Sequence, residues 1–188
     1  MNADNSTQHT TQQAPRTQPK IPRTIWVLVG AAFIIALGYG LIAPVLPQFA
    51  GSFGVSMAAA GAVISIFALA RLLGAPGAGR LVDRLGSRPI YLTGLLIVAG
   101  ATFLVAFVNA YWQILALRFI AGFGSTMFTL SAQALIVRVT HPSIRGRANA
   151  LYASAFLVGN VVGPIIGAAL SFLGFRAPFV IYGLAVAG

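Results

Sequence analysis

Charged residues are missing from five long stretches of this chain, and no other feature restricts its possible folds as strongly. A transmembrane helix needs about 20 mostly apolar residues to cross roughly 30 Å of hydrocarbon. Only 7% of the residues are charged and 58% are hydrophobic, whereas about 25% charged residues is typical of soluble domains. The chain is therefore predicted to be an all-α, polytopic membrane helical bundle. The charge-free stretches are 24–70, 89–117, 119–137, 148–175 and 177–188.

We expect five complete spans within a transmembrane domain at 23–188, and part of a sixth. The sixth apolar run has eleven residues, which at roughly 1.5 Å per residue cover only about 16 Å of helix. The sequence is therefore expected to be cut short inside its sixth helix. Residues 1–22 are rich in Thr, Gln, Asn and Pro, so they are expected to form a disordered tail. The predicted spans are about 25–45, 57–79, 90–108, 112–137 and 148–173, with the partial span at 178–188.

The basic residues are distributed unevenly between the two ends of these spans. Three lie in the tail, three between the second and third spans and three between the fourth and fifth, whereas the opposite side has only Arg176. Lys and Arg are concentrated in the cytoplasmic loops of membrane proteins. Nine basic residues against one therefore predict a cytoplasmic amino terminus and a multi-pass protein of the cell membrane, the inner membrane in bacteria.

Composition also argues against several other functions. The chain has no cysteine and two isolated histidines, so we expect neither a metal site nor a cofactor. No nucleophile and base occur together, so an enzyme is not expected. The net charge of +10 comes mostly from short segments between apolar runs, which topology explains better than nucleic-acid binding does. The glycine-rich run at 74–79 lacks the Gly-Lys-(Ser/Thr) ending of a phosphate-binding loop.

The connection after the second span carries the most specific motif. It closely resembles the loop signature of the major facilitator superfamily, Gly-x-x-x-Asp-(Arg/Lys)-x-Gly-x-(Arg/Lys), at the place where that family has it. The resemblance implies a cytoplasmic latch that joins two transporter halves and opens during alternating access. An ordinary basic loop that follows topology is the alternative interpretation. The matching residues are Gly79, Asp83, Arg84, Gly86 and Arg88.

Two arginines lie within apolar spans, where a charge is expensive and is expected to face a cavity, the bundle interior or the interface. Arg118 opens a stretch in the fourth span that is similar to the Arg-x-x-x-Gly-x-Gly pattern of the same family, which implies a substrate or proton-pathway residue. Arg118 lies about six residues from the start of this span, so its side chain could instead extend to the outer surface. Arg71, in the second span, is expected to line the cavity or to reach the cytoplasmic interface.

A glycine stripe in the fifth span is the third resemblance. It fits the Gly-x-x-x-Gly-Pro-x-x-Gly signature of the family's antiporter branches, which implies a hinge and a contact between the two halves. Glycines four residues apart let another backbone approach closely, and Pro164 is expected to kink the helix because it removes a hydrogen bond to the Asn160 carbonyl. Generic helix packing is the alternative. The stripe consists of Gly159, Gly163, Pro164 and Gly167.

Together these resemblances cover roughly seven-eighths of the chain and imply the amino-terminal six-helix half of a twelve-helix transporter. The function implied is secondary active efflux of drugs or small metabolites across the lipid bilayer by alternating access. The implied partner is a carboxy-terminal half of the same transporter, which this sequence does not contain. Uncharged residues expected in the substrate cavity are Tyr39, Gln133, Ser154 and Asn160.

Two aspects of this function stay open in the sequence. The predicted spans contain no acidic residue, whereas proton antiport usually needs a membrane-embedded carboxylate, so a symporter or uniporter is an alternative to proton-linked efflux. A second alternative is a half-length protein that transports nothing and acts in membrane assembly. It is suggested because the glycine stripe would need a partner. Coding sequence that continues into further apolar runs favours the transporter, and a natural stop codon favours the half-length protein.

Overall fold

The computed structural model describes residues 21–170 and 179–182, and no strand occurs among them. This part of the chain is helical almost throughout, as the apolar stretches predicted. The predicted tail lies almost entirely outside the described residues, and so does the partial sixth span apart from a helical segment at 179–182. The helices are α1 (Arg23–Ile42), α2 (Val45–Gly51), α3 (Met57–Leu85), α4 (Ser87–Val105), α5 (Tyr111–Val139), the 3-10 helix η1 (Pro142–Ile144) and α6 (Arg145–Leu170).

Within the described residues, five helical segments are long and apolar enough to cross a membrane when α1 and α2 are counted as one. Their outer surfaces carry large apolar side chains, such as Leu72, which is 72% exposed, and Ile165, which is 66% exposed. In water, so many exposed apolar groups would mark an aggregation-prone surface. Facing lipid, they are in their preferred environment, and the helices satisfy their own backbone hydrogen bonds. The polytopic membrane bundle predicted from the sequence is confirmed.

The first span is interrupted near its carboxy-terminal end, where two residues separate α1 from α2. Pro44 lies immediately before α2, and Pro47 is the third residue of that helix. Proline is tolerated there because the first N–H groups of a helix have no partner within it. The segment between the predicted spans 25–45 and 57–79 is therefore helical in its first part, since α2 continues to Gly51 and only 52–56 connect it to α3.

The connection between α3 and α4 is far shorter than the sequence suggested. Residues 79–85 are the last turns of α3, and α4 starts at Ser87, so Gly86 alone lies between the two helices. Its φ of 88° and ψ of 159° belong to a backbone region that is essentially restricted to glycine. The motif is therefore a helix end followed by a one-residue turn, not an extended loop.

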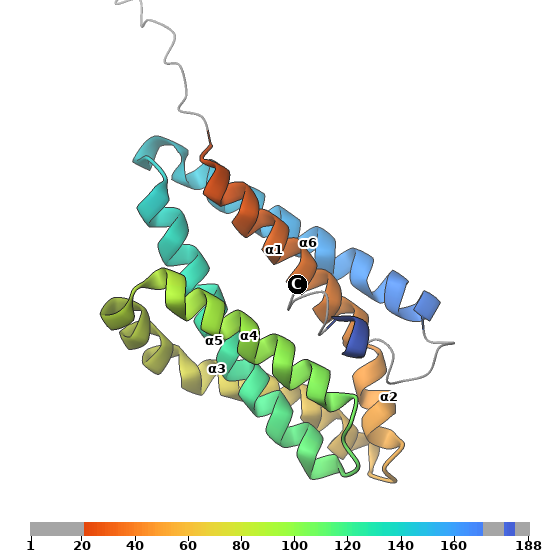
Figure 1. Ribbon diagram of the computed structural model, residues 1–188. Coiled ribbons are helices and arrows are strands. Elements are labelled where there is room, and N and C mark those ends of the chain that lie inside the picture. The colour runs from red at the N-terminus through yellow and green to blue at the C-terminus, as the bar shows by residue number, and fades with distance from the viewer. Residues whose placement is uncertain (1–20, 171–178, 183–188) are drawn as a thin grey trace, which may run out of the picture.

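The helices form two groups, visible in Figure 1. One group is the pair of α1 and α6, which lie side by side although they are distant in the sequence. In the other group, α5 packs against both α3 and α4. Small residues permit the close approach within the second group: a Cβ on Gly122 would lie 2.5 Å from the Phe67 carbonyl oxygen, and one on Gly94 would lie 2.6 Å from the Phe128 nitrogen.

The glycine stripe of α6 packs against α1 within the same half. A Cβ on Gly159 would lie 2.6 Å from the Phe33 carbonyl oxygen, and one on Gly167 would lie 2.6 Å from the Leu41 carbonyl oxygen. A Cβ on Gly163 would overlap the Leu37 carbonyl oxygen. In this half the stripe therefore serves helix packing against α1, which is the alternative interpretation of the motif, and a contact between the two halves stays a prediction. The helix also runs unbroken through Pro164.

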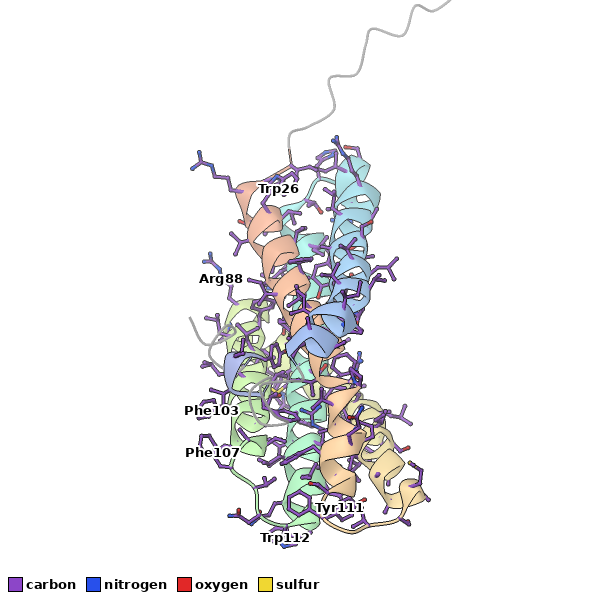
Figure 2. All side chains as sticks on the ribbon, turned by 90° about the vertical axis from the view of Figure 1, so that its right-hand side faces the viewer. Trp26, Arg88, Phe103, Phe107, Tyr111 and Trp112 are labelled. Carbon is purple, nitrogen blue, oxygen red and sulfur yellow. The ribbon has the colours of Figure 1, made fainter. Side chains whose placement is uncertain are left out.

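Aromatic side chains mark the two ends of the bundle in Figure 2. Trp26 lies near the start of α1 and is 57% exposed, whereas Trp112, at the start of α5 and the opposite end of the bundle, is 66% exposed. Tyr111 lies beside Trp112 in the sequence and donates a hydrogen bond from its hydroxyl to the Ala59 carbonyl at 2.6 Å. Tryptophan and tyrosine are enriched at both membrane interfaces, so the long axis of the bundle is oriented across the bilayer.

Candidate functional site

A cavity of about 90 Å³ lies inside the bundle and is lined by residues from both helix groups. A smaller cavity of about 50 Å³ adjoins it, since both are lined by Tyr39, Ile42, Phe67 and Arg118. The wall is mainly apolar and aromatic, with hydroxyl groups and two guanidinium groups among the apolar side chains. The larger cavity is lined by Ile35, Tyr39, Ile42, Phe67, Arg71, Val98, Thr102, Arg118, Ala121, Ser125, Phe128, Thr129, Phe156 and Tyr182.

Arg118 is the most buried charged residue of this wall, with 4% of its surface exposed. Its Nη2 donates to the Thr102 Oγ1 at 3.4 Å, which is a long hydrogen bond. The guanidinium carbon lies 5.7 Å from the centre of the Phe67 ring, within the range of a cation–π contact. Nε is buried and has no hydrogen-bond partner among the described residues. The side chain therefore points into the bundle and does not extend to the outer surface.

The close packing of α5 with α3 and α4 explains why Arg118 cannot turn outward. Gly122, one turn after Arg118, lies against the Phe67 backbone, and Gly94 and Gly124 bring α4 into contact with α5. Thr126 adds a hydrogen bond from its hydroxyl to the Arg71 carbonyl oxygen at 3.1 Å. These contacts hold α5 in one rotation about its axis, with Arg118 directed at α4 and at the ring of Phe67 on α3.

Arg71 lines the same cavity from α3, although the residue as a whole is exposed. The helix persists to Leu85, so Arg71 and Asp83, twelve residues apart, belong to one continuous helix. Within the described residues, the Arg71 side chain makes no hydrogen bond or ion pair. Two locations were expected for Arg71, the cavity wall and the cytoplasmic interface. In the structure Arg71 is part of the cavity wall.

Of the four uncharged residues expected in the cavity, one lies there. Tyr39 is part of the wall and packs its ring 5.5 Å from that of Phe67. Gln133 and Ser154 are exposed, and neither belongs to the described cavity walls. Asn160 is half-buried and donates from Nδ2 to the Phe156 carbonyl oxygen of its own helix at 3.0 Å. A polar residue in a span is therefore a weak indicator of the cavity, because its helix face decides where it points.

The charged residues of the latch motif are exposed at the end of α3 and the start of α4. Asp83, Arg84 and Arg88 all face outward, and the Arg88 side chain extends away from the ribbon in Figure 2. An Asp83 carboxylate in this position could pair with a neighbouring arginine or accept hydrogen bonds from a helix amino end. Within the described part of the chain, neither contact is present. Gly79 lies inside α3, and nothing lies within 4 Å of a Cβ built on it.

Sequence reasoning missed several residues of the cavity wall. Phe67 and Phe128 looked like ordinary lipid-facing or core residues, and Thr102 had no motif around it. Tyr182 lies beyond the last complete span, yet it is 4% exposed and its ring covers the glycine backbone of α1 at Gly38. Hydroxyl groups recurring on one face of α5, at Ser125 and Thr129, were the only available signal.

Comparisons with known proteins show which family and which fold this chain resembles. The family model described as the Major Facilitator Superfamily matches residues 28–188. Multidrug resistance protein MdtG from Escherichia fergusonii is 34% identical over 167 residues, which are 86% of this chain and 41% of that protein. The same protein from Salmonella arizonae is 34% identical over 165 residues. The chain spans about two fifths of the length of these relatives.

Solved structures resemble the fold. A peptide transporter POT in complex with sulfate superimposes with a TM-score of 0.78 at 16% identity, over 88% of this chain and 36% of that one. The human organic anion transporter MFSD10 superimposes with a TM-score of 0.76 at 23% identity, over 90% of this chain and 46% of that one. At these identities the likeness concerns the fold alone.

Proposed function

Because this chain belongs to the major facilitator superfamily, we propose that it forms the amino-terminal half of a secondary active transporter that exports drugs or small metabolites. Transport by alternating access needs a substrate site near the midplane of the membrane, between two sets of helices. The relatives named multidrug resistance protein MdtG support export as the direction. A carboxy-terminal half of the same transporter would supply the second set of helices.

The observation that carries this proposal is the cavity around Arg118. Its wall combines helices of both groups, so a shift of α1 and α6 relative to α3, α4 and α5 changes its shape. Ligand sites are typically apolar clefts with a few well-placed polar groups, and this wall has that character. We assign the cavity as the share of the substrate site that this half contributes.

The latch motif supports the same mechanism. Asp83, Arg84 and Arg88 are exposed and have no ion-pair partner among the described residues, so they are available to charged residues of another half. In this proposal they lie on the cytoplasmic side, the side on which the amino terminus also lies. Contacts made there hold the cytoplasmic side closed, and their release opens it.

Proton coupling is part of the proposal, with the acidic group outside this chain's described spans. Asp83 is the one acidic residue of the described part, and it is exposed at a helix end. A carboxylate that exchanges protons with changing access is therefore proposed to belong to the carboxy-terminal half. Symport and uniport differ from antiport in their response to a pH gradient, which makes them separable by experiment.

The transport experiment uses host cells that lack their main efflux pumps and express the natural gene. We expect lower accumulation of at least one fluorescent drug than in cells with an empty vector, and restored accumulation after a protonophore. Equal accumulation in both, with the protein demonstrated in the membrane, would overturn the transport proposal. In reconstituted vesicles, a flux that persists unchanged after the pH gradient is abolished would remove proton antiport and leave the other modes.

The alternative of a half-length assembly protein loses its main support. It relied on a glycine stripe in need of a partner, and α1 covers that stripe. Its distinguishing expectation is a stable dimer held together through α6. Measurement of the oligomeric state in lipid nanodiscs, with Gly163 replaced, therefore separates the two functions.

A further inference from the structure

The guanidinium group of Arg118 has fewer partners than its burial requires. Guanidinium presents five N–H donors, and the described residues accept one hydrogen bond from it, at 3.4 Å from Thr102. Nε is buried without any partner. A charge in a low-dielectric interior is strongly disfavoured unless it is paired and hydrogen-bonded. The unsatisfied group faces a cavity, so a ligand in that cavity can supply the missing acceptors.

No carboxylate of the described chain can neutralise Arg118. Asp83 is the single acidic residue in this part, and it lies on α3 twelve residues beyond Arg71, exposed at the helix end. The other side chains that contact Arg118 are neutral: the hydroxyl of Thr102 and the ring of Phe67. A second guanidinium, that of Arg71, lines the same cavity. The cavity therefore has positive charge and no negative charge among its described wall residues.

The remainder of the wall sets the chemistry of the rest of the ligand. Phe67, Phe128 and Phe156 provide aromatic surface, and Ile35, Ile42 and Val98 provide aliphatic surface. Tyr39, Tyr182 and Ser125 are also residues of the wall, and a hydroxyl group can donate a hydrogen bond to an oxyanion. A guanidinium group is well suited to such a partner because its planar fork matches carboxylate geometry.

We propose that this cavity binds the anionic group of an amphipathic organic anion, a carboxylate or sulfonate on an apolar or aromatic body. Arg118 pairs with the anionic group, Arg71 contributes long-range attraction, and the aromatic side chains hold the apolar body. A lipophilic cation of the same size would meet two positive charges, with no carboxylate among the described wall residues to balance them. This assignment rests on the proposed transport function for its biological meaning, whereas the binding itself does not depend on transport.

The test measures binding by the natural protein in lipid nanodiscs with three probes of one shape and different charge. The probes are benzenesulfonate, its neutral analogue benzenesulfonamide, and benzylammonium, each titrated by calorimetry with empty nanodiscs as the blank. We expect benzenesulfonate to bind most tightly and benzylammonium most weakly. Equal binding of all three probes, or preference for the cation, would overturn the proposal.

Three variants locate the binding. Arg118→Gln keeps most of the side-chain length and removes the charge, so it is expected to weaken benzenesulfonate about tenfold or more, as loss of a charge-assisted hydrogen bond implies. Its affinity for benzenesulfonamide is expected to change much less. Arg118→Lys is expected to restore part of the lost affinity, because the charge returns without the fork. Arg138→Gln is the matched control, since Arg138 lies exposed on the same helix and should leave all three affinities unchanged.

Two results decide against the anion site. One is an Arg118→Gln protein that retains its helical circular dichroism and binds benzenesulfonate as the natural protein does, which would mean that another residue neutralises Arg118. The other is equal loss of the sulfonate and the sulfonamide, which would indicate a damaged cavity wall. If Arg118→Gln does not fold, the benzenesulfonate affinities of Arg118→Lys and Arg138→Gln are compared instead. A weaker affinity in Arg118→Lys alone supports the anion site, and equal affinities overturn it. Anion binding without transport would support this inference and overturn the transport proposal. Transport of neutral or cationic drugs alone would support the transport proposal and overturn the anion site.

Discussion

At the scale of single residues, the central feature of the site is the buried charge of Arg118, which has too few hydrogen-bond partners among the described residues. Arg118 is 4% exposed, has one long hydrogen bond to Thr102, and keeps Nε without a partner in the described part of the chain. A residue kept at such a cost to stability is expected to serve ligand binding, because proteins often trade stability for function at a site. The same reasoning separates Arg118 from Arg138, whose charge is exposed.

The first residue-scale prediction concerns the stability that the buried charge of Arg118 costs the protein. Arg118→Met removes the buried charge and fills a similar volume with apolar atoms, so the ligand-free protein is expected to become more stable, by about 1 kcal/mol or more. Thermal unfolding followed by circular dichroism in detergent measures the change. Arg138→Gln, at an exposed position, should shift stability by no more than about 0.5 kcal/mol. A clear loss of stability in Arg118→Met would mean that Arg118 has partners that keep its charge satisfied.

The second residue-scale prediction concerns Gly86. Its φ of 88° and ψ of 159° are closed to other residues, while a Cβ there would meet nothing closer than the Pro89 Cδ at 4.0 Å. Gly86→Ala is therefore expected to cost about 1–3 kcal/mol through backbone strain alone. Gly100→Ala is the control, because Gly100 lies within α4 with nothing within 4 Å of an added Cβ. Equal thermal stability of the two variants would contradict a backbone role for Gly86.

At the scale of helices, glycines set how closely α6 and α1 approach. Both partners contribute, since a Cβ on Gly40 would lie 2.9 Å from the Pro164 Cδ and 3.0 Å from the Asn160 carbonyl oxygen. That carbonyl is the one that Pro164 deprives of its helical hydrogen bond. The proline and glycines of α6 therefore serve the contact with α1, which brings Tyr39 to the cavity from one side while Phe156 reaches it from α6.

The element-scale prediction tests this contact. Gly163→Ala places a methyl group against the backbone of α1 at Leu37, Gly40 and Leu41, so the helices must separate and stability is expected to fall by about 1–3 kcal/mol. Gly61→Ala in α3 is the matched control, because nothing lies within 4 Å of its added Cβ and alanine favours the helix. Unfolding in detergent compares them. If Gly163→Ala were as stable as Gly61→Ala, the contact between α1 and α6 would not be as close as described.

At the scale of the whole molecule, the bundle has two chemically distinct ends. The end that holds the α5–η1–α6 connection and the start of α1 carries arginines, whereas the end that holds the connection between α4 and α5 has Tyr111 and Trp112 and no charged residue in that connection. Positive charge is retained on the cytoplasmic side of membranes. The arginine-rich end is accordingly proposed to face the cytoplasm.

The prediction at this scale uses the absence of cysteine from the chain. Asn109→Cys and Ser143→Cys place one thiol at exposed positions of opposite ends. In intact cells, a membrane-impermeant maleimide is expected to label Asn109→Cys at once, and Ser143→Cys only after the membrane is permeabilised. The same protein without the added cysteine gives the background. The reverse labelling pattern would invert the proposed orientation.

Much of the architecture was predictable because it depends on local properties of the chain. The number of helices that cross the membrane follows from the length of apolar stretches, which can be read without knowing any contact. The ends of those helices were less predictable. The predicted spans ended at 45 and 79, whereas helix continues to Gly51 in α2 and to Leu85 in α3. Proline at a helix start and glycine at a one-residue turn act over only a few residues, so such ends are hard to predict.

The site was predictable only in part. The sequence by itself determined that Arg71 and Arg118 lie within apolar spans, since their flanking residues leave no other placement. Only the tertiary structure decided that both line one cavity with Tyr39, that Gln133 and Asn160 do not, and that α1 covers the glycine stripe of α6. The reason is that a helix exposes a different face every residue, and the rotation of each helix is set by partners distant in the sequence.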